Sequence, residues 1–131
     1  MIKDIKEMFD VAVPDNVVLT MNATHGLNLA IKSIVSSGDT VVISGYEHNA
    51  VTRPLTAIGN VSVRIVHGKV FDSDQMAEGF ERCINKGVKA VICTHVSNVF
   101  GFVLPIEDIA DICNVFFTAS CRMRCCDDAH I

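Results

Sequence analysis

Hydrophobic and polar positions along the chain predict strands and helices in alternation. Hydrophobic residues at helical spacing predict helices over residues 2–9, 23–35, 49–58, 73–84 and 104–113. Runs rich in β-branched residues predict strands over residues 16–20, 40–44, 61–66, 88–98 and 115–118, the fourth with a polar end. Strand and helix thus alternate five times, which predicts an α/β fold: three layers, a mostly parallel sheet with helices on both faces, and right-handed crossovers.

Composition and charge limit the kinds of partner that the chain is expected to bind. The 131 residues suffice for one domain, and half of them are hydrophobic, which predicts a well-filled interior. A net charge of −4 without a run of basic residues predicts neither a nucleic-acid partner nor a membrane partner, and favours a small ligand. The first 16 residues resemble neither a signal peptide nor a transit peptide, so we expect a cytoplasmic protein.

Ligands of parallel sheets collect beyond the carboxyl ends of the strands, here residues 20–25, 44–49 and 94–101. The glycine-rich dinucleotide and Walker A patterns are absent. A phosphate could still bind at the predicted helix start, which offers free N–H groups and the hydroxyl of Thr24. The alternative is that Thr24 only caps its helix.

Two more polar residues at these strand ends have two interpretations each. His48 could act in chemistry, or it could be a hydrogen-bonded structural histidine. Asn98 could contact a ligand, or it could form a turn together with Gly101. Each signal is weak when taken alone.

In combination, three segments resemble the class V aminotransferase superfamily, most closely its cysteine desulfurase-like members. "NATHGLNLAI" is similar to the family's Ala-Thr-Glu-x-x-Asn segment. "SGDTVVISGYEHNAVTRPL" is similar to its Gly-Asp…Glu-His-x-(Ala/Ser) segment, and "THVSNVFGFVLPIEDIADIC" to its Ser-Asn-x-x-Gly…Pro-Ile segment. The resemblance extends from about residue 5 to residue 118.

The resemblance implies a pyridoxal phosphate cofactor on the large domain of a fold-type-I enzyme. It implies that Ala23, Thr24 and His25 hold the cofactor phosphate, that His48 is the catalytic histidine over the pyridine ring, and that Asn98 lies beside the ring hydroxyl. His25 stands where the family usually has Glu. A small amino-acid substrate and a homodimer are implied for the parent enzyme, and no metal site is expected.

The sequence departs from the family after residue 118. The family places an acid that pairs with the pyridine nitrogen, and later a Schiff-base lysine, downstream of the strand that corresponds to "VFFT". No residue here matches either group, and Lys86 and Lys89 lie at the wrong end of a predicted strand. We therefore expect residues 1–118 to be a partial cofactor-binding domain, the N-terminal fragment of a cysteine desulfurase or class V aminotransferase, inactive by itself.

The last 13 residues form a separate cysteine-rich tail. Cys121, Cys125, Cys126 and His130 are soft ligands, but their spacing matches no common zinc site. The other interpretation is a shifted reading frame: starting one nucleotide into the Ala119 codon, suitable codons spell Gln-Ala-Ala-Gly, similar to the family sequence. The alternative function is a non-catalytic α/β module that binds a phosphate ligand, or a metal through the tail.

Overall fold

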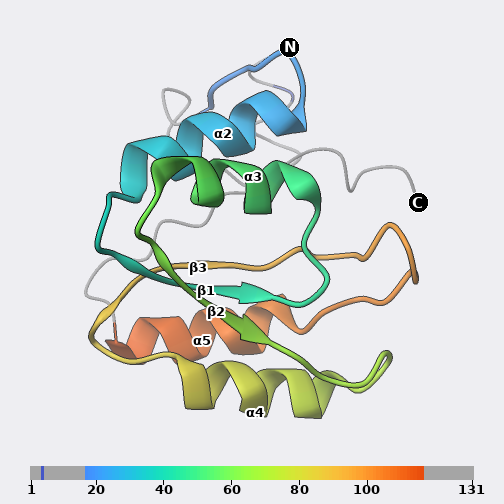
Figure 1. Ribbon diagram of the computed structural model, residues 1–131. Coiled ribbons are helices and arrows are strands. Elements are labelled where there is room, and N and C mark those ends of the chain that lie inside the picture. Colours follow the sequence, from blue (N-terminus) through green and yellow to red (C-terminus); the bar gives the residue numbers. More distant parts are fainter. Residues whose placement is uncertain (1–3, 5–16, 117–131) are drawn as a thin grey trace.

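Three parallel strands form the middle layer of the protein, and helices cover both of their faces (Figure 1). The structure is a computed structural model that describes residue 4 and residues 17–116. Its elements are, in chain order, α2 (Ala23–Ile34), β1 (Thr40–Ser44), α3 (Asn49–Ile58), β2 (Ser62–Val66), α4 (Ser73–Cys83), β3 (Val88–Ile92) and α5 (Ile106–Phe116). The predicted three-layer α/β fold is confirmed.

The strand order β2-β1-β3 places β1 in the centre of the sheet. The chain leaves β1 through α3 to reach β2 on one side, and then crosses over β1 through α4 to reach β3 on the other side. The two crossovers run in opposite directions across the sheet. Since α3 and α4 lie on opposite faces of the sheet (Figure 1), both crossovers have the same hand. The chain therefore reverses its direction of travel across the sheet at β2.

Alternating residues of β1 build two separate cores. Val41 and Ile43 pack with α2 and α3, in a cluster that also includes Ile31, Val35, Val51 and Leu55. Val42 faces the other way and packs with α4 and α5, in a cluster that also includes Val66, Met76, Phe80, Ile84, Val88, Phe102, Leu104 and Ile109. This alternation is the period of two that a strand imposes on its side chains.

Two of the predicted strands are wrong within the described residues. Residues 17–20 form no strand, and Val18 and Leu19 are exposed. A β-branched run becomes a strand only when a neighbouring strand accepts its hydrogen bonds, and local sequence does not supply that neighbour. Val115 and Phe116 are the last residues of α5 instead of the start of a strand, since no glycine or proline stops the helix before them.

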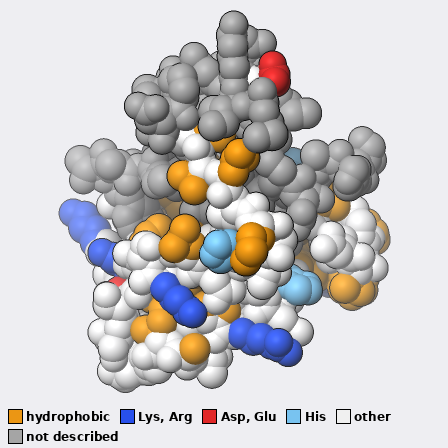
Figure 2. Space-filling model, turned by 90° about the horizontal axis from the view of Figure 1, so that it is seen from above, with side chains coloured by type: hydrophobic (Ala, Val, Ile, Leu, Met, Phe, Trp, Pro, Cys, Tyr) orange, Lys and Arg blue, Asp and Glu red, His pale blue; other side chains and the backbone are white. Residues whose placement is uncertain are grey.

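The predicted helix over residues 2–9 lies outside the described residues apart from Asp4, and so do residues 117–131 with the cysteine-rich tail. None of the helices within the described part is long and apolar enough to cross a membrane. On the face that α2 and α3 form, the described positive side chains are separated from one another among histidine and hydrophobic side chains (Figure 2).

Candidate functional site

The three predicted ligand-binding segments lie at one edge of the sheet. Helices α2 and α3 begin at the edge where the strands end, and the loop from β3 to α5 lies there too (Figure 1). The loops after β1 and β3 lead to helices on opposite faces of the sheet. Such a divergence between neighbouring strands is where α/β sheets bind ligands.

Helix α2 begins with a cap that leaves Thr24 available. Asn22 is the N-cap, and its side-chain oxygen accepts a hydrogen bond from the N–H of His25 at 2.9 Å. The alternative interpretation of Thr24 as the N-cap is therefore wrong: Thr24 lies in the first turn and is exposed. The N–H groups of Ala23 and Thr24 belong to that first turn, which has no intrahelical acceptor for them. This helix start suits an anion.

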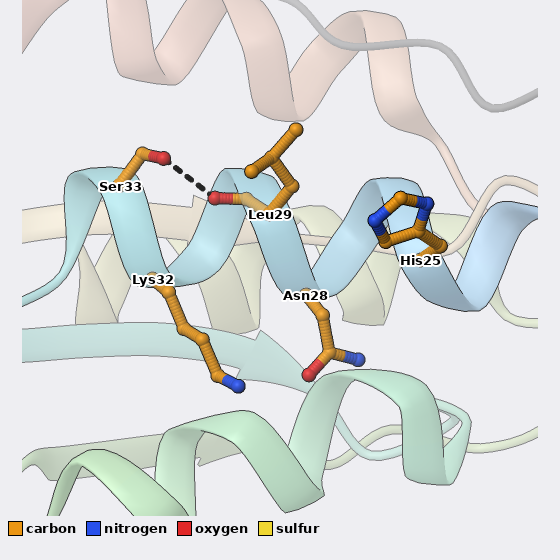
Figure 3. Close-up of a pocket in the computed structure, with 5 residues that line it drawn as sticks. All are labelled: His25, Asn28, Leu29, Lys32 and Ser33. Carbon is orange, nitrogen blue, oxygen red and sulfur yellow. Dashed lines mark hydrogen bonds between the residues drawn. The ribbon is translucent and has the colours of Figure 1, made fainter. Parts of the chain in front are cut away.

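His25 points away along the outside of α2. It lines a shallow hollow of about 270 Å³ with Asn28, Leu29, Lys32 and Ser33, all from the same helix (Figure 3). Within that hollow the hydroxyl of Ser33 donates to the carbonyl of Leu29 at 2.7 Å. Because all the described lining residues belong to α2, none of the described groups at the strand ends lines this hollow. The His25 imidazole thus lines this hollow, whereas Thr24 is not among its described lining residues.

His48 is the N-cap of α3 and is exposed. Its Nδ1 accepts a hydrogen bond from the N–H of Ala50 at 3.1 Å. An accepting Nδ1 carries no proton, so the ring proton of the neutral imidazole resides on Nε2. The hydrogen-bonded structural role that the sequence allowed is present, and it also fixes the tautomer and orientation of an exposed ring.

Asn98 lies in a hairpin between β3 and α5. The N–H of Gly101 donates to the carbonyl of Ser97 at 2.8 Å, and the N–H of Ser97 donates to the carbonyl of Phe102 at 2.9 Å. Gly101 has a φ of 64°, in the left-handed region that glycine adopts at little cost. Asn98 is thus exposed in a glycine-closed turn, as one of its two interpretations predicted, and its side chain remains available to a ligand.

Glu47 is the residue that the sequence reasoning missed. Its carboxylate accepts hydrogen bonds from the Ser44 hydroxyl at 2.5 Å and from the N–H of Thr94 at 2.7 Å, both at Oε1. Burial raises the pKa of the Glu47 carboxyl, while the bonds from Ser44 and Thr94 act to lower it. The available signal was an acid three residues after the end of a buried strand and next to His48.

Two of the described cysteines, Cys93 and Cys113, are not suited to nucleophilic chemistry. Burial raises the pKa of the Cys93 thiol, with a further contribution from the neighbouring Glu47, and burial also raises the pKa of Cys113. Thiols with raised pKa values carry little thiolate at neutral pH. Among the described residues, no three histidine, cysteine or acidic side chains gather as a metal site would require.

Comparison with known proteins agrees with this architecture. The sequence matches the family Aminotransferase class-V over residues 2–119, and the chain belongs to that family. A probable cysteine desulfurase of Mycoplasma pneumoniae is 30% identical over 99 residues, which cover 72% of this chain and 24% of the relative. The chain therefore spans about a quarter of the length of that relative.

Solved structures share the fold. The cystine C-S lyase C-DES, in complex with its reaction product cysteine persulfide, superposes with a TM-score of 0.73 at 20% identity, covering 86% of this chain and 31% of C-DES. A C-DES mutant with glycine covalently linked to its PLP cofactor gives a TM-score of 0.72 at 20% identity, covering 87% of this chain and 31% of the mutant. The likeness extends over most of the described residues.

The two lysines near β3 lie away from the candidate site. Lys86 belongs to the turn before β3, and Lys89 is the second residue of that strand, with its side chain exposed. Both are at the amino end of β3, whereas Thr24, His48 and Asn98 lie toward the carboxyl ends. Neither lysine can serve the candidate site.

Proposed function

We propose that this chain is the N-terminal part of the large domain of a pyridoxal phosphate-dependent cysteine desulfurase, inactive without the remainder of that enzyme. One observation carries the proposal: in a class V family chain, Thr24, His48 and Asn98 belong to segments that lie toward the same end of the sheet, where the strands end. The parent enzyme would act on a small amino-acid substrate as a cytoplasmic homodimer, with no nucleic acid and no membrane as partner. The names of the relatives favour this function over a non-catalytic binding module.

The described residues fit the cofactor. Ala23 and Thr24 would hold its phosphate, because the first turn of α2 offers unpaired N–H groups and an exposed hydroxyl. His48 would stack on the pyridine ring, and Asn98 would donate its amide to the ring hydroxyl. His25 would contribute only to the surroundings of the phosphate, since its backbone N–H already donates to the side chain of Asn22. When bound, pyridoxal phosphate supplies an electron sink for bonds at the substrate α-carbon.

The first test is binding of a cofactor analogue that cannot form a Schiff base. We expect pyridoxine 5′-phosphate to bind the full chain weakly and non-covalently, by titration calorimetry. Thr24→Val removes a hydroxyl donor to a charged phosphate, and His48→Ala removes a stacking ring, so each should weaken binding by about tenfold, the equivalent of ~1.4 kcal/mol. Thr56→Ala, on an exposed turn of α3 near its C-terminus, is the matched control and should bind as the original chain does.

Equal affinity for all four proteins would contradict the assignment of Thr24 and His48. Pyridoxal phosphate itself, followed by borohydride, should label no single lysine stoichiometrically, because the chain has no lysine at the family position. A unique stoichiometric adduct accompanied by desulfurase activity would overturn the proposed inactivity.

We further propose that residues 119–131 are not part of the native domain. A tail that was never selected to pack can be removed at little cost. The chain that ends at Thr118 should melt within ~2 °C of the full chain under reducing conditions, with or without stoichiometric zinc. A metal-binding tail would instead add ~2.7 kcal/mol at a hundredfold excess of zinc over its Kd, and would raise the melting temperature of the full chain alone.

A further inference from the structure

We propose that Glu47 is a positioning residue that clamps the hairpin carrying Asn98 to the loop carrying His48, across the point where β1 and β3 diverge. The ligand-binding roles of Asn98 and His48 rest on the proposed function, whereas the clamp itself rests on hydrogen bonds between described residues. Glu47 does not need to touch the ligand for this role.

The clamp begins where the sheet ends. The last paired residues of β1 and β3 are Ile43 and Ile92, so the backbone ladder does not continue to Thr94. Beyond this pair the β1 loop leaves toward α3 and the β3 loop leaves toward α5, on opposite faces. The N–H of Thr94 therefore finds its acceptor in the carboxylate of Glu47, 47 residues earlier in the chain. One side chain extends the connection between the two strands past their last backbone pair.

On the β3 side, Thr94 is the root of the hairpin that carries Asn98. The Thr94 hydroxyl donates to the carbonyl of Val96 at 3.2 Å, and the N–H of Leu104 donates to the carbonyl of His95 at 2.8 Å. Val96 and Val103 form an antiparallel bridge above this root. The hairpin is thus cross-linked within itself, and fixing Thr94 fixes the hairpin as a unit.

On the β1 side, the same carboxylate oxygen is bonded to the last residue of the strand. Ser44 is 1% exposed, and its hydroxyl donates to Glu47 while accepting from the N–H of Tyr46 at 3.3 Å. His48, the next residue after Glu47, is held by its own bond to Ala50. The segment from Ser44 to Ala50 is therefore fixed at both ends, with Glu47 in the middle.

The cost of burying this carboxyl argues for a role beyond stability. Glu47 is half-buried, so its carboxyl gives up part of its hydration, which its hydrogen bonds only partly replace, and this desolvation raises its pKa. Apolar side chains of similar volume can replace even buried ion pairs without loss of stability. An apolar residue could not accept from both Ser44 and Thr94. Glu47 supplies a side chain long enough to place an oxygen acceptor between the two loops. This acceptor does not require a negative charge.

The test uses the full chain and separates the effect of the length of the Glu47 side chain from the effect of its charge. Glu47→Gln keeps the length and the acceptor oxygen and removes the charge, whereas Glu47→Asp keeps the charge and shortens the side chain by one methylene. Both variants are conservative enough to fold. Val88→Ala, buried at the amino end of β3, is the control for a general loss of stability. The readouts are amide hydrogen exchange of Thr94, the ¹⁵N shifts of the His48 ring, and affinity for pyridoxine 5′-phosphate.

We expect Glu47→Gln to match the original chain within about twofold in exchange and in affinity. Glu47→Asp should exchange the Thr94 amide about tenfold faster and bind the analogue about tenfold more weakly, with altered His48 shifts. Val88→Ala should leave all three unchanged after correction for its stability. Normal Thr94 protection in Glu47→Asp, an equal defect in Glu47→Gln, or an equal defect in Val88→Ala would each overturn the clamp. Absence of binding by the original chain would contradict the proposed function instead, and the exchange of Thr94 would still decide on the clamp.

Discussion

Phe80→Ala should lower the free energy of unfolding by about 3–5 kcal/mol, a large share of the ~5–15 kcal/mol that holds a domain together. Phe80 in α4 is fully buried, in the cluster that joins β1 and β2 to α4 and α5. Truncation removes an aromatic ring from contact with several elements and leaves a cavity that the surrounding backbone fills only in part.

Urea-induced unfolding of the full chain measures this loss. Val99→Ala is the control, because Val99 is 81% exposed and its truncation should change stability by no more than ~0.5 kcal/mol. A Phe80→Ala variant as stable as the control would mean that Phe80 is not in the core described here. Loss of any cooperative transition would agree with the prediction, since the variant would then be unfolded before urea is added.

Gly79→Val should be the second large effect, at about 3 kcal/mol of destabilisation. Gly79 lies in α4 against β2, and a Cβ atom added there would approach Cγ1 of Val66 to 2.6 Å. Val66 is 2% exposed and β-branched, so it can move aside neither into solvent nor to another rotamer at low cost. Valine has a better helix propensity than glycine by only ~0.3 kcal/mol, so overpacking decides the sign.

A double-mutant cycle isolates this contact. Val66→Ala removes the methyl group that an added Cβ would meet, so the Gly79→Val, Val66→Ala pair should lose less stability than the sum of the two single variants, by ~0.5–3 kcal/mol. Urea titrations of the original chain, the two single variants and the double variant provide the three changes in unfolding free energy. Strict additivity would show that Gly79 is required for a reason other than its approach to Val66.

The candidate site was partly visible in the sequence, because its signals are local. A polar residue that follows a predicted strand or begins a predicted helix is expected at the carboxyl ends of parallel strands, so Thr24, His48 and Asn98 could be proposed without coordinates. Their roles toward a cofactor came from the family resemblance and remain predictions. Glu47 was missed because its partner Thr94 is 47 residues away. Nothing in the pattern around Glu47 distinguishes a carboxylate that turns inward from one that faces water.

The sequence by itself determined the existence of helices α2 to α5, of the three strands and of the layered α/β class, since hydrophobic period and β-branched runs act within a few residues. The strand predicted over residues 88–98 ends at Ile92, where its pairing with β1 stops. Tertiary structure decided which predicted strands exist: residues 17–20 are not a strand among the described residues, and Val115 continues α5. It also decided that Asn22 caps α2 in place of Thr24, and that Glu47 joins two loops. The physical reason is the same in each case: a strand, a cap or a clamp exists only where its hydrogen-bond partner is brought to it, and for a strand or a clamp that partner comes from a distant part of the chain.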